Sequence, residues 1–167
     1  MLAWADRVLQ AHADHEAIII THCYMYMDGT RNKPGDEHNP KAYKGAVGAN
    51  DGEDMWQKCF RKHPNLAAVY SGHQIYDNIS YRIDPGERLN RVFQSFQNWQ
   101  CTERGGEGRV RIVVYRQQDR RVEHYVWNSL SGQYETEPGY RVDIPMRSNE
   151  NLQAEWKEFV FPRVTGS

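Results

Sequence analysis

Two histidines, His22 and His73, stand at matching places in the sequence, each just after a short apolar segment. His22 follows residues 17–20, and His73 follows residues 66–70 through a Ser-Gly pair. Neutral imidazole is the commonest protein ligand for transition metals, so a matched pair of this kind predicts half of a metal site. For either histidine alone, a hydrogen-bonded packing role is the more usual alternative, and it stays open here.

The elements around these histidines are predicted to bring them together. Short apolar runs without alternation, such as residues 17–20 and 66–70, are typical of strands covered on both faces. A helix is predicted between them, across residues 53–63, with Asp51 as its cap. A strand–helix–strand unit makes its strands parallel, so both histidines should emerge at one carboxyl edge of a sheet. Ligand sites in such sheets gather at that edge.

The segment from residue 23 to residue 50 is predicted to be a long loop, because glycine and proline punctuate it throughout. Loops of this length in compact domains are often functional. Several side chains in or near the loop could complete a metal site: Asp28, Asp36, His38, Asp51 and Asp77. Aspartate and histidine are also ordinary turn residues, so we expect most of them to be solvated.

The second half of the chain has a different pattern. Residues 75–83, 90–100, 109–116 and 121–127 are rich in β-formers and are separated by turn signals, which predicts an antiparallel meander. At the other end, apolar residues recur at helical spacing across residues 2–9. The sequence therefore predicts a mixed α/β (α+β) fold, with a helix–strand–helix–strand unit followed by an antiparallel β-meander.

Several segments, in this order, resemble the later metal motifs of calcineurin-like metallophosphoesterases. The resemblance begins with residues 17–22 (AIIITH), a long loop, a helix and residues 64–73 (PNLAAVYSGH). It continues with residues 90–94 (NRVFQ), 98–100 (NWQ) and 105–111 (GGEGRVR), which resemble a stretch common in bacterial members. The likeness covers roughly residues 1–130, and the ordered series carries it.

The resemblance implies a β-sandwich in which two divalent metal ions (Mn, Zn, Fe or Mg) are bridged by a carboxylate and a water or hydroxide. Such metals lower the pKa of water and polarise phosphorus–oxygen bonds, so that hydroxide can attack a phosphoester. His22 would match the isolated histidine motif and His73 the first histidine of G-H-x-H, both ligands of the second metal. By analogy, Trp99 and Gln100 would line a pocket for a small phosphoester; a core aromatic and a strand amide are the alternative.

The sequence departs from the family pattern at several ligand positions. Ile75 stands where G-H-x-H has its second histidine, and an aliphatic side chain cannot coordinate a metal. The early motifs D-x-H, G-D-x-x-D and G-N-H-[DE] are absent from the residues ahead of His22. An open catalytic zinc site has about three protein ligands, so two imidazoles imply a weak or incomplete site. We expect little turnover by this chain alone, and no catalytic residue is assigned.

Composition excludes several other classes of function. Lys and Arg total 21 against 22 Asp and Glu, so nothing in the charge predicts binding to nucleic acid or to an acidic membrane surface. Apolar runs such as residues 17–20 and 66–70 are too short to cross a bilayer, and the first residues do not resemble a signal peptide. Cys23, Cys59 and Cys101 are widely spaced without C-x-x-C, which predicts reduced, buried thiols and neither disulfides nor a structural zinc site.

Three hypotheses follow. Residues 1–146 could be the C-terminal half of a calcineurin-like phosphoesterase domain, with a tail at residues 147–167; exposed apolar surface would then favour self-association or binding of a missing N-terminal half. The chain could instead be a non-catalytic ligand- or protein-binding remnant of the family, which Ile75 favours. It could also be an unrelated α/β domain with structural histidines.

Overall fold

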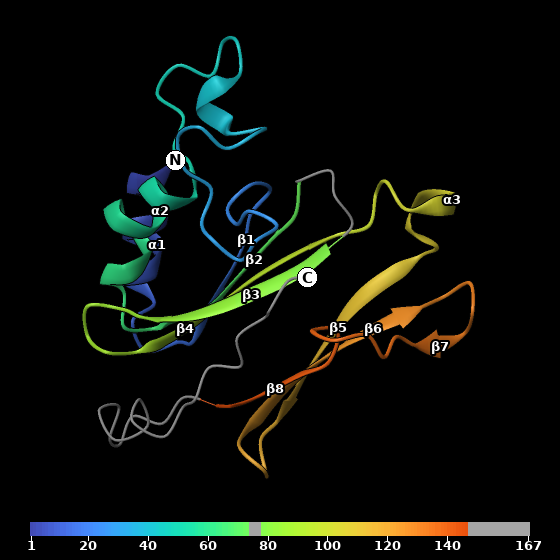
Figure 1. The fold of residues 1–167 in the computed structure, drawn as a ribbon. Coiled ribbons are helices and arrows are strands. Elements are labelled where there is room, and N and C mark those ends of the chain that lie inside the picture. The colour runs from blue at the N-terminus through green and yellow to red at the C-terminus, as the bar shows by residue number, and fades with distance from the viewer. Residues whose placement is uncertain (74–77, 147–167) are drawn as a thin grey trace. The chain divides into compact units, whose positions relative to one another are not determined.

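The structure is a computed structural model that describes residues 1–73 and 78–146 (Figure 1). Ile75, Asp77 and the predicted tail lie outside the described residues. The chain divides into two compact units, Met1–Glu107 and a second that begins at Gly108. The first unit contains α1 (Leu2–Ala11), β1 (Ala17–Ile20), η1 (Pro40–Ala42), α2 (Gly52–Lys58), η2 (Phe60–Lys62), β2 (Leu66–Ser71), β3 (Asn78–Pro85), β4 (Arg91–Asn98) and α3 (Glu103–Gly106). The second contains β5 (Arg109–Arg116), β6 (Arg121–Asn128), β7 (Gln133–Tyr134) and β8 (Val142–Pro145).

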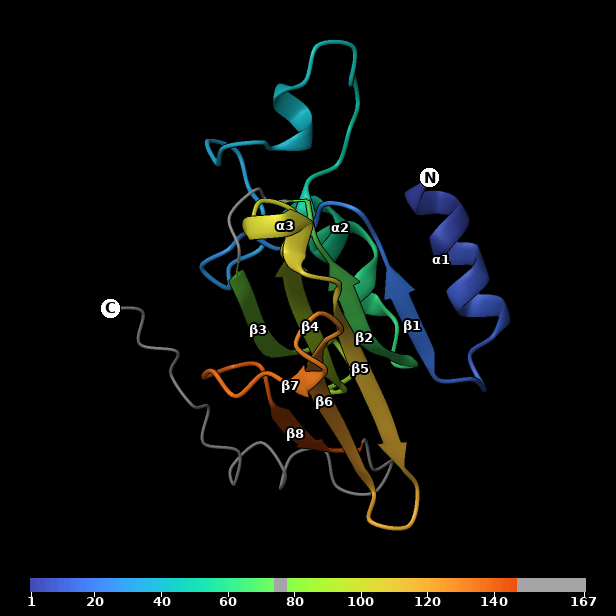
Figure 2. The same ribbon diagram turned by 90° about the vertical axis from the view of Figure 1, so that its right-hand side faces the viewer.

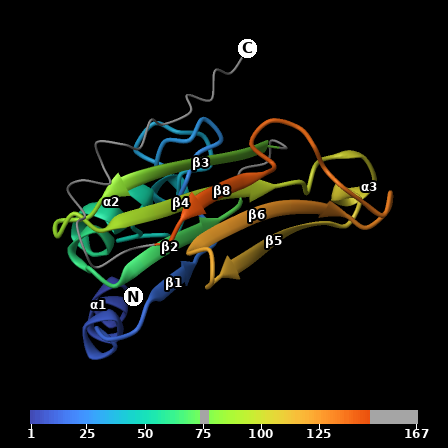
Figure 3. The same ribbon diagram turned by 90° about the horizontal axis from the view of Figure 1, so that it is seen from below.

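The first unit is built on a four-stranded sheet in the order β1-β2-β4-β3. β1 and β2 are parallel, with Ile19 opposite Val69, and β2 and β4 are also parallel, while β3 runs antiparallel to β4. Helices α1 and α2 lie against the same face of this sheet (Figure 3). The predicted parallel pairing of the first two strands is therefore confirmed.

The core of the first unit lies between these helices and the sheet. Leu9 of α1 and Trp56 of α2 pack with Val69 of β2 and Phe96 of β4. Tyr24 and Met25, from the start of the long loop, are fully buried in the same cluster. The loop that follows His22 is thus anchored in the core at its beginning.

Strand β1 is covered on one face only, which corrects the expectation of a strand covered on both. Ala17 and Ile19 pack against the core, whereas Ile18 is 45% exposed and Ile20 is 83% exposed. β1 is an edge strand whose described partner is β2. A run of β-branched residues does not alternate in polarity, so its sequence cannot indicate which face is covered.

The second unit is an antiparallel sheet formed by the later strands of the predicted meander (Figure 2). β5 and β6 pair from Arg109 opposite Asn128 to Arg116 opposite Arg121, and β7 and β8 each pair with β6. The prediction of a single meander through the second half was wrong. β3 and β4 belong to the first sheet, and β4 lies parallel to β2. Residues 91–96 of β4 are all buried, which requires a central place in a sheet.

Two predictions from the sequence concern the burial of the cysteines and the crossing of a membrane. Cys23 and Cys59 are buried as predicted, but Cys101 is exposed, because it lies in the turn after β4. Within the described part of the chain, no helix combines the length and the apolar character that crossing a membrane requires.

Candidate functional site

The structure places His22 and His73 side by side. Each follows the carboxyl end of a strand, and backbone hydrogen bonds from Thr21 to Tyr70 and from Gly72 to His22 hold the two chain segments together beyond those ends. The centroids of the two imidazole rings are 4.4 Å apart, with an angle of 58° between the ring planes. That the pair binds a metal remains a prediction.

The long loop adds a third histidine and a tyrosine to the pair. The ring centroid of His38 lies 6.2 Å from that of His73. Tyr43 forms a hydrogen bond of 2.9 Å between its Oη and Nε2 of His73. Sequence analysis named His38 only as one of several loop residues that could complete a metal site. No local pattern indicates where a long loop returns to the sheet.

His73 occupies an unusual backbone conformation. Its φ of 79° lies in the left-handed region, which residues other than glycine rarely adopt. Partial burial lowers the pKa of the His73 imidazole, and the neighbouring rings of His22 and His38 lower this pKa further, against a hydrogen bond with the His38 backbone. This lowering favours the neutral ring, which is the form that coordinates metals.

A buried arginine fixes the start of the loop to the sheet. Arg31 is 8% exposed, and its Nη1 donates to Asp84 Oδ2 of β3 at 2.5 Å and to Gln94 Oε1 of β4 at 2.9 Å. Its Nε donates to Glu53 of α2 at 2.8 Å, and its guanidinium lies 4.5 Å from the centroid of the Trp56 ring. Arg31 thus ties the loop to both layers of the first unit.

The far end of the loop meets α2 at a glycine. Asp51 caps the helix as predicted, since its Oδ1 accepts a hydrogen bond of 2.9 Å from the backbone of Asp54. A β-carbon at Gly52 would lie 1.8 Å from the carbonyl oxygen of Tyr24, so only glycine allows this close approach. The cap and the glycine together fix where the loop ends.

The aspartates proposed as further ligands have other partners. Asp28 accepts hydrogen bonds from the backbone and hydroxyl of Thr30, at 2.8 and 2.7 Å. Asp36 accepts from the backbone of Lys33 at 2.9 Å. Asp51 is 1% exposed, which corrects the expectation of a solvated side chain. These carboxylates stabilise the turns of the loop and the start of α2.

Trp99 and Gln100 follow β4 at the same sheet edge as the histidines, because β4 runs parallel to β2. Trp99 is half-buried and Gln100 is exposed. The backbone carbonyl of Trp99 accepts a 2.7 Å hydrogen bond from the Thr102 hydroxyl. A role for these two residues in substrate binding stays a prediction.

No family model matches the sequence, and no solved structure matches it. Among curated proteins, it is similar to the uncharacterized protein YvnB of Bacillus subtilis (strain 168), with 25% identity over 122 residues. The matched part is 70% of this chain but 8% of YvnB. The chain thus resembles a small part of a much longer protein, and this likeness assigns neither a family nor an activity.

Proposed function

We propose that this chain is part of a metal-dependent phosphoesterase, in which His22 and His73 bind one divalent cation. The observation that supports this proposal is the 4.4 Å separation of the two rings at the ends of adjacent parallel strands. Ligands on strand ends are held more rigidly than ligands within loops, which favours a preorganised site. The donor set fits a borderline cation such as Zn²⁺ or Fe²⁺.

The two imidazoles account for only part of a catalytic site. A bound cation would activate a water molecule and polarise a phosphoester, but it needs more ligands than two imidazoles. Asp28, Asp36 and Asp51 are engaged elsewhere, so the missing carboxylates would come from outside these positions. The small share of YvnB that this chain matches supports a role within a longer polypeptide.

Tyr43 would orient His73 within this site. Metal-bound histidines usually donate their second ring nitrogen to an outer partner, which fixes the ring. Tyr43 occupies Nε2 of His73, so Nδ1 is the nitrogen left for the cation unless the tyrosine moves away. Tyr43 is 45% exposed, which leaves room for such a movement.

A non-catalytic ligand-binding role is the second candidate. The aliphatic side chain of Ile75, at the family's second histidine position, favours it. The first candidate predicts a metal at the histidine pair that recognises phosphate, whereas the second predicts only a ligand- or protein-binding surface at the sheet end and the long loop. Calorimetric titration of the metal-loaded chain with inorganic phosphate separates them: metal-dependent heat favours the phosphoesterase, and its absence favours the other role.

Elemental analysis after dialysis against Zn²⁺ tests the metal site itself. We expect bound zinc in the parent chain to fall on His22→Ala and on His73→Ala, since either change leaves one imidazole. His15→Ala is the matched control, because His15 is exposed and bonded to Asp14 in the turn after α1. Equal zinc in all four proteins would contradict the proposal.

A further inference from the structure

A second cluster of ligand-type side chains lies at the other end of β2. Asp6 comes from α1, Cys59 ends α2, and His63 follows η2 shortly before β2 begins. His63 precedes β2 whereas His73 follows it, so the cluster and the histidine pair lie at opposite ends of this strand. Neither the resemblance nor the proposed function accounts for this cluster.

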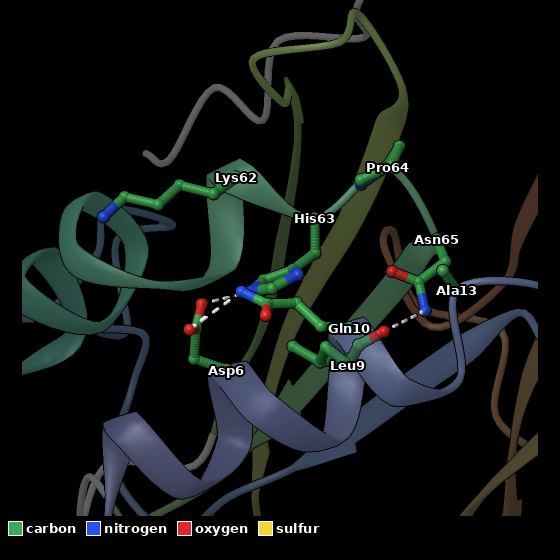
Figure 4. A pocket seen from close by; sticks show the side chains of 8 residues that line it. All are labelled: Asp6, Leu9, Gln10, Ala13, Lys62, His63, Pro64 and Asn65. Carbon is green, nitrogen blue, oxygen red and sulfur yellow. Dashed lines mark hydrogen bonds and ion pairs between the residues drawn. The ribbon is translucent and has the colours of Figure 1, made fainter.

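The three side chains point at one another. Nε2 of His63 and Oδ1 of Asp6 are 2.9 Å apart (Figure 4), and one ligand atom of each of the three residues lies within 4.8 Å of the other two. Gln10 donates a 3.0 Å hydrogen bond to Oδ2 of Asp6, which orients the carboxylate. Cys59 is 1% exposed and His63 is 4% exposed, so two of the three groups are fixed by packing.

We propose that Asp6, Cys59 and His63 bind a zinc-class cation. Thiolate, imidazole and carboxylate are the three ligand types that zinc takes in proteins. On binding, the thiol of Cys59 would release its proton to solvent, and His63 would coordinate the ion through neutral imidazole. Two anionic ligands would then balance the two positive charges of the ion, which limits the cost of holding it in a largely buried place.

The spacing of the three groups is close to what a tetrahedral ion requires. With bonds of about 2.0 Å to nitrogen and oxygen and about 2.3 Å to sulfur, ligand atoms lie about 3.3 to 3.6 Å apart. Asp6 and His63 must therefore separate slightly from 2.9 Å, and Cys59 must approach them from at most 4.8 Å. The distance changes amount to about 1.5 Å or less for each pair of ligand atoms.

A pocket beside the cluster gives the ion an entry path and a fourth ligand. It has a volume of about 270 Å³, and Asp6 and His63 line it together with Leu9, Lys62 and Asn65 (Figure 4). A water molecule in this pocket could complete the coordination of the ion. This second cluster could not be predicted from the sequence, because Asp6 is remote in the chain from Cys59 and His63.

The same three residue types could instead form a nucleophilic triad, but the environment of the thiol is wrong for that chemistry. Burial raises the pKa of Cys59, and the nearby charge of Asp6 raises it further. A nucleophilic cysteine needs a lowered pKa and access to a substrate. At 1% exposure, Cys59 has neither.

Titration of the full chain with Co²⁺ tests this proposal, because a cobalt–thiolate bond gives a charge-transfer band in the near ultraviolet. We expect one such band that saturates at one ion per chain and disappears in Cys59→Ser. Cys23→Ser and Cys101→Ser are the matched controls, and each should retain the band. The double variant His22→Ala/His73→Ala should retain it too, so this site can fail or succeed independently of the proposed function.

A second variant protects the test against misfolding of Cys59→Ser. Asp6 is only partly buried, so Asp6→Asn is expected to weaken Co²⁺ binding at least tenfold without disturbing the core. The proposal is overturned if the parent chain gives no thiolate band, or if the band survives in both Cys59→Ser and Asp6→Asn. Rapid alkylation of Cys59 at neutral pH, unaffected by Zn²⁺, would also overturn it and indicate a reactive thiol.

Discussion

At the scale of single residues, His73 combines a functional place with backbone strain. A non-glycine residue with a φ of 79° costs roughly 1 to 2 kcal/mol relative to glycine. Strain of this kind persists where the surrounding structure fixes the conformation, and it concentrates at ligand sites. Here the hydrogen bond between Tyr43 and His73 and the backbone hydrogen bond from Gly72 to His22 fix the turn.

Two substitutions of His73 separate the role of its imidazole ring from the cost of its backbone conformation. His73→Gly and His73→Ala both remove the imidazole, so both should lose the metal at the histidine pair. The glycine variant should nevertheless be more stable than the alanine variant by about 1 kcal/mol, because glycine adopts positive φ at little cost. Urea denaturation measures the difference; equal midpoints would show that the backbone relaxes.

His124 in β6 is a second histidine in an unusual environment. It is fully buried, and burial lowers its pKa to about 4, with the charge of Arg111 contributing and that of Asp143 opposing. Above pH 6.5 the histidine is neutral in both folded and unfolded chains. Between pH 6.5 and about 4 the unfolded chain binds a proton that the folded chain does not, so stability falls as the pH falls.

This difference in proton binding between the folded and unfolded chains predicts that acid lowers the stability of the second unit. Lowering the pH from 7 to 4.5 should cost the parent chain roughly 2 kcal/mol through His124, given the size of the pKa shift. The variant His124→Leu lacks the group and should lose less stability over the same interval. The comparison uses urea midpoints at both pH values for both proteins. Identical losses in the two would assign the acid effect to other groups.

At the scale of elements, the sequence predicted those with local signals. β5 and β6 were located well because alternating β-formers flank a clear turn. The start of α2 was located by its Asp51 cap, but the helix ends at Lys58 and not at residue 63 as predicted, and η2 follows it. The partner of β4 was missed, because pairing with β2 joins segments far apart in the sequence. The contact of His38 and Tyr43 with His73 was missed for the same reason.

Arg31 is the residue expected to hold the long loop to these elements. Arg31→Met should destabilise the first unit by about 3 kcal/mol, because it removes the cation from a buried network with Asp84 and Glu53. Arg104→Met is the matched control in the same unit: Arg104 is 61% exposed, and its pair with Glu107 should contribute little. Urea denaturation compares the two variants, and equal small losses would show that the network does not anchor the loop.

At the scale of the whole molecule, one candidate metal site lies at each end of strand β2 in the first sheet. The histidine pair lies at the carboxyl end of β2, and the Asp6–Cys59–His63 cluster lies at its amino end. The exposed face of β1, with Ile18 and Ile20, agrees with the expectation that this chain associates with a partner or with itself. That association remains a prediction, which sedimentation of the isolated chain would measure.

The central claim is that His22 and His73 bind one cation together. Labelling the chain with ¹⁵N-histidine and titrating it with Zn²⁺ tests this claim directly, since the imidazole nitrogens of all seven histidines can be followed at once. We predict that the resonances of His22 and His73 shift together and saturate at the same zinc concentration, while exposed His15 does not change. Resonances of His22 and His73 that stay unchanged, or that shift independently of each other, would contradict the account.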